Sequence, residues 1–362
     1  MSYSIPNIDF LKICPSKSLS FKNFLFLNDY TFWTQISKNS EILLNLSKLD
    51  YIQHDGAIWV AYIVALRNHL NFKTFISLPI KSNVLGFLKS INFNYLADGI
   101  NTHFLDNAII YNTEKTYTHS NEIERELSRL ITINGSSLSI SFERIGFLLN
   151  DYIKVSQIQK ASQANISHLF NANFTTPITE LIKNIIDYGG VSYGDGIGYC
   201  SLIPPVKNSS FLRYCFVDIG KGFRQTLLEK DDEDDINKLG KISNDEEAII
   251  KGLLFRKTIV KEKIIGLYPV LGIICATKGS IGVRSGSSIV EINFQNQQKF
   301  ENFKEYFMTK SSDSIDDCLT FLSNGIVAPT SCFLIPGSQI YIDLGLNFID
   351  YELLNFIEKN LA

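Results

Sequence analysis

The sequence has little excess charge of either sign, few cysteines and no long apolar run. Its 34 Lys and Arg residues nearly balance 37 Asp and Glu residues, so the formal net charge is −3. Such a weak charge argues against a general electrostatic attraction to nucleic acid or to an acidic membrane surface. We therefore expect neither nucleic acid nor a membrane as a partner.

The cysteines show none of the spacing that is typical of metal sites or disulfide frameworks. The six cysteines stand at positions 14, 200, 215, 275, 318 and 332, without a Cys-x-x-Cys pair. This spacing predicts no zinc site and favours a reducing compartment. The first residues lack the charged and apolar regions of a signal peptide, and no uncharged apolar run approaches the ~18 residues of a membrane helix. We therefore expect a cytoplasmic protein.

The sequence does have enough apolar content for a substantial core, over a length that fits two domains. Of its 362 residues, 45% are hydrophobic and 20% are charged, and domains commonly hold roughly 100–200 residues. We predict an α+β chain with a first domain over residues 1–115 and a second over residues 116–362. The core of the second domain is expected over about 140–345, with an insertion at 292–330.

The first domain shows alternating strand and helix patterns. Strands are predicted at 41–46, 71–79 and 103–112, and helices at 57–70 and 82–93. This order predicts a small open α/β structure. A turn at His54-Asp55-Gly56 is expected to open the first helix. A polar linker at 113–122 follows, and then helical patterns at 123–132 and 142–173.

Over residues 41–112 this pattern resembles STAS-like domains, the fold of anti-sigma-factor antagonists. That family carries a phosphorylatable Ser or Thr at the start of its first long helix. Here Asp55-Gly56-Ala57 stands at this point and has no hydroxyl group. The resemblance therefore implies that the domain docks a protein partner rather than accepting a phosphate.

A helix predicted over Thr176–Asp187 carries two polar side chains on one face. Thr176-Pro177 suits a helix start, and Gly189-Gly190 suits a helix end. Glu180 and Asn184 are four residues apart, so their side chains share a face. A carboxylate and a carboxamide placed in this way can hold a hydrated divalent cation and position a water molecule. A solvated helix edge has the same pattern, so the rest of the chain must decide.

A second polar pattern comes at the end of an apolar strand. The strand predicted at 211–217 ends in Asp218-Ile219-Gly220-Lys221-Gly222. A buried Asp carboxylate at this place can accept a hydrogen bond from the amino group of adenine. The glycines allow the backbone to approach the base, because they have no Cβ atom. The same pattern also occurs as an ordinary turn.

Together, Glu-x-x-x-Asn in a helix and Asp-x-Gly-x-Gly after a strand resemble the GHKL superfamily of ATP-binding domains. That superfamily includes histidine kinases, mismatch-repair ATPases, gyrase-type topoisomerases, heat-shock chaperones and anti-sigma-factor kinases. Gly266-Leu267 matches part of its Gly-x-Gly-Leu lid motif, with Ile264 in place of the first glycine. Gly337-Ser338 stands where the family has a Gly-Thr strand. The resemblance implies a Bergerat fold, an α/β sandwich with a mixed sheet and helices on one face.

The resemblance also implies a role for each matching residue. Asn184 would ligate Mg²⁺ at the phosphates of ATP, and Glu180 would be the general base. Asp218 would select adenine, and Gly220 and Gly222 would shape its pocket. Further nucleotide-binding positions implied in this way are Asp187, Gly266, Leu267 and Ser338.

Three functions stay open at this stage. The protein could be an ATP-dependent switch with slow hydrolysis, an anti-sigma-type serine/threonine kinase, or a nucleotide-binding scaffold without turnover. The missing lid glycine favours binding over catalysis. A histidine kinase is disfavoured, because neither His119 nor His168 lies in that family's His-Glu/Asp helix pattern. The acidic run at 228–238 is expected to be a lid insertion. In each of the three cases the protein could act as a homodimer.

Overall fold

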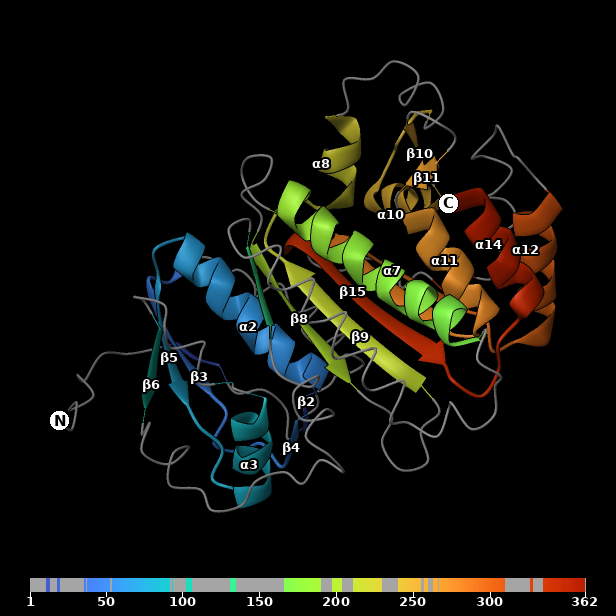
Figure 1. The fold of residues 1–362 in the computed structure, drawn as a ribbon. Helices are drawn as coiled ribbons and strands as arrows, with labels where there is room; N and C mark the ends of the chain where they lie inside the picture. The colour runs from blue at the N-terminus through green and yellow to red at the C-terminus, as the bar shows by residue number, and fades with distance from the viewer. Residues whose placement is uncertain are drawn as a thin grey trace. The chain divides into compact units, whose positions relative to one another are not determined.

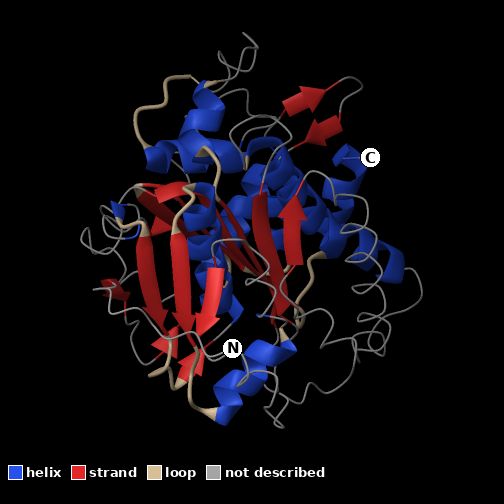
Figure 2. Ribbon diagram, turned by 90° about the vertical axis from the view of Figure 1, so that its left-hand side faces the viewer, coloured by secondary structure: helices blue, strands red, loops and turns tan. Residues whose placement is uncertain are grey.

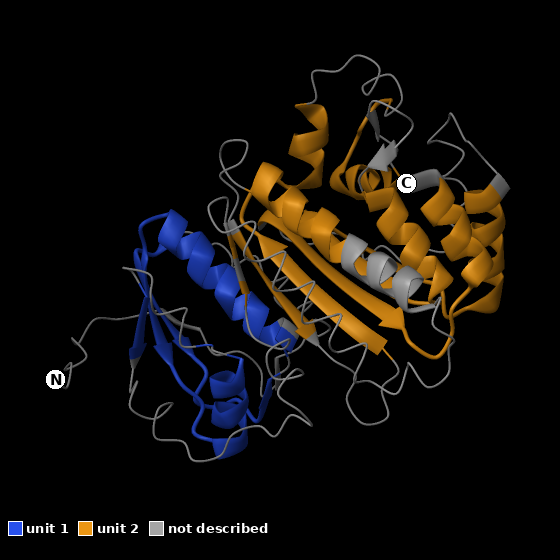
Figure 3. Cartoon of the chain, viewed as in Figure 1, with its two compact units in different colours: residues 1–119 blue, residues 120–362 orange. Residues whose placement is uncertain are grey.

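The computed structural model of the chain divides into two compact units, residues 1–119 and residues 120–362 (Figures 1 and 3). The residues described are 11–13, 18–19, 36, 38–52, 54–91, 93, 102–105, 131–134, 166–189, 197–203, 211–229, 240–254, 257–259, 263–265, 267–309, 326–327 and 335–361.

Unit 1 contains a parallel sheet with the strand order β1-β3-β5-β6. Its strands are β1 (Leu11–Ile13), β3 (Glu41–Asn45), β5 (Lys73–Ser77) and β6 (Thr102–Leu105), and its helices are α2 (His54–His69) and α3 (Ser82–Ser90). A separate pair is formed by β2 (Ser18–Leu19) and β4 (Tyr51–Ile52). Helices α2 and α3 connect successive strands, as parallel pairing requires. The predicted strand–helix alternation is therefore confirmed.

Two boundaries in unit 1 differ from the prediction. The expected turn at His54-Asp55-Gly56 is wrong, because these residues form the first turn of α2. The last strand occupies residues 102–105, and positions 106–112 of its predicted range lie outside the described residues. Every residue of α2 from Gly56 to Arg67 is buried, so the burial of this helix extends around its whole circumference.

The fully buried Arg67 fixes α2 to the strands beside it. Its guanidinium donates five hydrogen bonds of 2.6–3.2 Å, to the Thr74 hydroxyl and to the carbonyls of Ile36, Asn39, Ser40 and Lys73. Burial lowers the pKa of Arg67 to about 10, which still leaves the side chain charged at neutral pH. The hydrogen bonds to carbonyl oxygens compensate for part of the lost hydration.

Unit 2 is built on a seven-stranded sheet with the order β14-β13-β12-β15-β9-β8-β7. The strands are β7 (Ile131–Asn134), β8 (Ile197–Ile203), β9 (Phe211–Asp218), β12 (Ser280–Gly286), β13 (Ser288–Asn293), β14 (Ile326–Val327) and β15 (Ile335–Gly345). A separate pair is formed by β10 (Lys257–Ile259) and β11 (Lys263–Ile265).

The strand pairs of this sheet are antiparallel in every described case. The expected mixed sheet is therefore wrong for unit 2. Strands β12 and β13 are separated by Ser287 alone, and so short a connection can only join antiparallel neighbours. The chain as a whole combines a parallel sheet, an antiparallel sheet and helices.

The described helices of unit 2 pack on the sheet, most of them through one apolar core (Figures 1 and 2). They are α7 (Ile166–Tyr188), α8 (Gly222–Leu228), α10 (Asp245–Leu254), α11 (Leu267–Ala276), α12 (Gln297–Thr309) and α14 (Tyr351–Leu361). Leu212, Tyr214 and Phe216 alternate along β9 and belong to this core. Helix α7 packs on β7, β8 and β9 with α11 beside it.

Among the described helices, none combines the length and the apolar character that a bilayer crossing requires.

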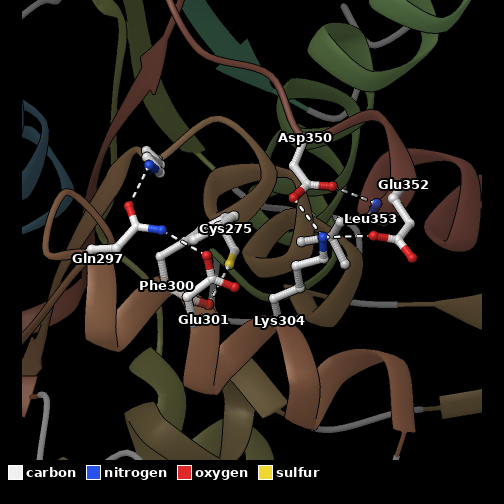
Figure 4. Close-up of polar contacts among 9 residues, drawn as sticks. Cys275, Gln297, Phe300, Glu301, Lys304, Asp350, Glu352 and Leu353 are labelled. Carbon is white, nitrogen blue, oxygen red and sulfur yellow. Dashed lines mark hydrogen bonds and ion pairs between the residues drawn. The ribbon is translucent and has the colours of Figure 1, made fainter.

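Residues 292–330 contribute to both the sheet and the core. They include the end of β13, helix α12 and strand β14, and Phe303 and Phe307 of α12 are buried. Polar contacts tie α12 to α14 (Figure 4): Lys304 Nζ lies 2.8 Å from carboxylate oxygens of both Asp350 and Glu352. Asp350 also accepts a hydrogen bond from the Leu353 N–H at 2.9 Å and so caps α14.

Two helix predictions in unit 2 need correction. Helix α7 begins at Ile166 rather than at Thr176, and Pro177 lies inside it. Proline removes one backbone hydrogen bond, but the buried apolar stripe that follows holds the helix against the sheet. Ile131 and Thr132 belong to β7 rather than to a helix end, as their β-branched side chains favour. The predictions for 113–122, 123–130, 142–165, 230–239 and Gly266 lie outside the described residues.

Candidate functional site

Polar side chains form a row where the apolar core of unit 2 ends. Ser285 of β12 pairs with Ser338 of β15, and Asp218 of β9 pairs with Gly198 of β8. Ser338 and Asp218 are joined by hydrogen bonds. Ser285, Ser338 and Asp218 therefore lie side by side on three neighbouring strands, and we call them the polar row. They lie on the core-facing side of the sheet. Val283, Ile340 and Phe216, which stand two residues away on the same three strands, belong to the apolar core on that side.

Asp218 is the charged member of the polar row, and it is half-buried. Its carboxylate accepts a hydrogen bond from the Gly220 N–H at 2.9 Å, and others from the N–H and the hydroxyl of Ser338. Burial raises the pKa of Asp218 to about 7, although these hydrogen bonds act to lower it. The carboxyl group therefore keeps its proton up to a higher pH than an exposed aspartate does.

Two glycines bring the end of α7 against the loop that follows Asp218. A Cβ atom on Gly220 would lie 2.4 Å from the Tyr188 carbonyl oxygen and 2.5 Å from Gly189 Cα. A Cβ atom on Gly189 would lie 3.1 Å from Asp218 Cβ. Because the two backbones are in direct contact, the position of α7 is fixed relative to the Asp218 carboxylate.

Two further glycines allow a close approach beside the polar row. Gly222 and Gly337 both have a φ of +73°, a conformation that side chains disfavour. A Cβ atom on Gly222 would lie 2.6 Å from Ser285 Oγ, and one on Gly337 would lie 2.0 Å from the Asp218 carbonyl oxygen. Gly220 and Gly222, predicted to make room for a base, are thus required by contacts within the protein itself.

Helix α7 carries the three polar residues that the sequence singled out. Glu180, Asn184 and Asp187 are half-buried, and their spacing of four and three residues puts them along one side of the helix. The opposite side is the buried apolar stripe of Ile178, Leu181, Ile182, Ile185 and Ile186. Asn184 stands one helical turn before Tyr188, whose carbonyl group packs against Gly220.

The remaining predicted site residues fall into two groups. Ser338 lies in the polar row, in direct contact with Asp218. Leu267 is the first residue of α11, and its side chain is buried in the core. Gly266 lies outside the described residues. The structure thus brings Asp218, Gly220, Gly222 and Ser338 together, and it joins them to α7 through Gly189.

Two contributors to this site were not singled out from the sequence. Ser285 Oγ accepts a hydrogen bond from the Phe223 N–H at 3.0 Å and lies 3.4 Å from Ser338 Oγ. The period-two alternation of Ile281, Val283 and Ser285 could have placed this serine on the core side of its strand. Its neighbour Ser338 depends on strand order, which the alternation does not reveal.

A metal centre built from protein side chains alone is not found within the described residues. No group of three or more His, Cys, Asp and Glu side chains lies there in positions that could hold a metal ion.

The chain matches no protein-family model, no curated protein and no solved structure in the comparisons made. The resemblance to the GHKL superfamily therefore depends on the residue patterns quoted above.

Proposed function

We propose that residues 120–362 bind Mg²⁺-ATP in the manner of a GHKL domain and act as an ATP-dependent switch. The observation that carries this proposal is the polar row, with a half-buried carboxylate whose pKa is raised to about 7 by burial. A carboxyl group kept in such a place costs stability. A ligand that donates a hydrogen bond to its ionised form would recover part of that cost.

Adenine fits the chemistry of this carboxylate. Its exocyclic amino group is a donor, and ionised Asp218 is an acceptor with lone pairs beyond those used by Gly220 and Ser338. Guanine presents a carbonyl oxygen at the corresponding ring position, which would face the carboxylate without a hydrogen bond. Asp218 would therefore favour ATP over GTP.

The phosphates would lie along α7 in this proposal. Asn184 would ligate the Mg²⁺ ion, which neutralises phosphate charge when it is bound. Glu180 would accept a proton from an attacking water molecule or protein hydroxyl group. Asp187 and the amide groups at Gly266-Leu267 would complete the contacts that the resemblance implies. Unit 1 would then be the docking surface for a protein partner.

Titration calorimetry of the full chain with Mg²⁺-ATP and Mg²⁺-GTP tests the proposal. We expect binding of ATP with a preference over GTP. Asn184→Ala should abolish Mg²⁺-ATP binding, and Asp218→Asn should remove most of the preference for ATP. Glu358→Gln changes an exposed carboxylate on α14 and is the control, with affinity unchanged. Unaltered affinity and preference in Asn184→Ala and Asp218→Asn would show that the site is misassigned.

The same preparation distinguishes the modes of action. Phosphate release from purified protein supports a switch driven by hydrolysis. Transfer of label from γ-labelled ATP to another protein supports an anti-sigma-type kinase. Tight binding with neither result supports a nucleotide-binding scaffold.

A further inference from the structure

Ser285 stands at the junction of three elements of unit 2. It lies near the end of β12, and its side chain is only 2% exposed. Its hydroxyl oxygen accepts a hydrogen bond from the Phe223 N–H of α8 at 3.0 Å. The same hydroxyl donates to the Gly337 carbonyl oxygen at 3.2 Å and accepts from the Ser338 hydroxyl at 3.4 Å, and both partners lie on β15. One buried hydroxyl group thus links α8, β12 and β15.

The Ser285 hydroxyl donates to the carbonyl oxygen of Gly337, which belongs to the same peptide group as the Ser338 N–H. That N–H donates a hydrogen bond to the Asp218 carboxylate. The donors therefore run in one direction, from the Phe223 N–H through the Ser285 hydroxyl and the Gly337–Ser338 peptide group to Asp218. Hydrogen bonds aligned in this way toward a negative charge strengthen one another.

The other side of this chain reaches α10. The Phe223 ring packs so closely against α10 that a Cβ atom on Gly252 would lie 2.5 Å from it. Phe223 also packs on the small cluster of Leu227, Ile242 and Ala248. At its N-terminal end α10 is fixed to the β12–β13 turn, because Asp245 accepts hydrogen bonds from the N–H and hydroxyl of Ser287 at 2.8 and 2.7 Å. Helix α10, which the Phe223 ring contacts, is therefore itself held in place by hydrogen bonds.

We propose that Ser285 is a positioning residue of the nucleotide site, which orients the Gly337–Ser338 peptide group so that the Ser338 N–H points at Asp218, and which anchors α8 beside the base. The inference depends on the proposed nucleotide function, and it assigns to base selection a residue that the superfamily pattern does not include. Ser285 does not touch the base in this proposal. It acts by keeping the acceptor lone pairs of Asp218 pointed at the ligand.

Competition binding of ATP and GTP to the full chain provides the test, with Ser285→Ala and Ser285→Cys as variants. Cysteine keeps nearly the volume of serine but is a weak hydrogen-bond donor. We expect both variants to lower ATP affinity by about fivefold, the effect of one hydrogen bond, and to leave GTP affinity nearly unchanged. The preference for ATP should therefore fall. Ser280→Ala, at the opposite end of β12, is the matched control and should preserve it.

The outcomes separate this inference from the function on which it rests. If the unmodified protein binds neither nucleotide, the proposed function fails and the inference fails with it. If the unmodified protein prefers ATP and both Ser285 variants keep that preference, only the inference is overturned. Ser285→Cys behaving like the unmodified protein while Ser285→Ala loses ATP affinity would assign Ser285 a packing role instead. Thermal melts identify any variant that does not fold. The nucleotide preference of the variant that does fold then decides whether the inference holds.

Discussion

Asp218→Asn should stabilise unit 2 at alkaline pH. Burial raises the pKa of Asp218 from 3.8 to about 7, so the folded protein holds a proton that the unfolded chain releases at intermediate pH. The stability conferred by this proton is complete below the unfolded pKa and is lost as the pH rises through the folded pKa. Above about pH 7 the folded state must therefore keep a half-buried carboxylate, whereas asparagine is neutral at every pH.

The size of the effect follows from the pKa shift and the contacts of Asp218. The shift corresponds to at most about 4 kcal/mol, and solvent screening reduces this figure because the residue is only half-buried. Asparagine keeps an acceptor for the Gly220 N–H, but it has one acceptor oxygen where the carboxylate has two, and the loss of one hydrogen bond costs about 1 kcal/mol. We expect the variant to be about 1–3 kcal/mol more stable near pH 8, and to have no advantage near pH 4.

Urea denaturation of the full chain, followed by far-UV circular dichroism at both pH values, measures this difference. Both tryptophans, Trp33 and Trp59, lie in unit 1, so tryptophan fluorescence reports the unfolding of unit 1 separately. Glu358→Gln is again the matched control, since its carboxylate is exposed. A gain in stability that is the same at both pH values, or a loss near pH 8, would refute the assignment of the raised pKa to Asp218.

Two further predictions concern α7 and unit 1. Glu180→Ala should retain Mg²⁺-ATP affinity and lower any turnover by about 10²–10⁴-fold; phosphate release at the original rate would remove Glu180 as the base. Arg67→Met should lower the unfolding free energy of unit 1 by about 3–5 kcal/mol, because it leaves buried carbonyl groups without donors, and this should appear in the tryptophan fluorescence transition. Lys48→Met, at an exposed position in the same unit, should leave that transition in place.

The sequence predicted the elements whose apolar pattern is strong. Strand β9 was predicted with nearly the observed bounds, because a continuous apolar run bounded by polar residues and Gly leaves few alternatives. Helix α12 was not predicted. Its exposed face is rich in Gln, Lys and Glu, and only its buried side, including Phe303 and Phe307, packs on the core. Its place in the core depends on tertiary packing.

The site could be predicted only in part, since its parts meet through strand order. Asp218 and Ser338 are far apart in the sequence, and they are neighbours because β15 lies between β12 and β9. Local patterns do not specify this order, so Ser338 could be proposed only through the family resemblance. Ser285 has no counterpart in that resemblance, and its role required the observed pairing with Ser338.

In the structure, the glycines and the aspartate of the Asp-x-Gly-x-Gly pattern differ in what they indicate about ligand binding. Gly220 and Gly222 are required by the protein itself, because added Cβ atoms would collide with Gly189 and with Ser285. Their presence would be expected even if no ligand bound. Contacts within the protein do not require Asp218 in the same way. Phe216 and Tyr214 fill the same side of the strand with core side chains, and an ionisable group beside them lowers the stability of the folded state at neutral pH. The proposed nucleotide function therefore depends on the carboxylate and not on the glycines, and for this reason Asp218→Asn is the variant that should separate stability from nucleotide selection.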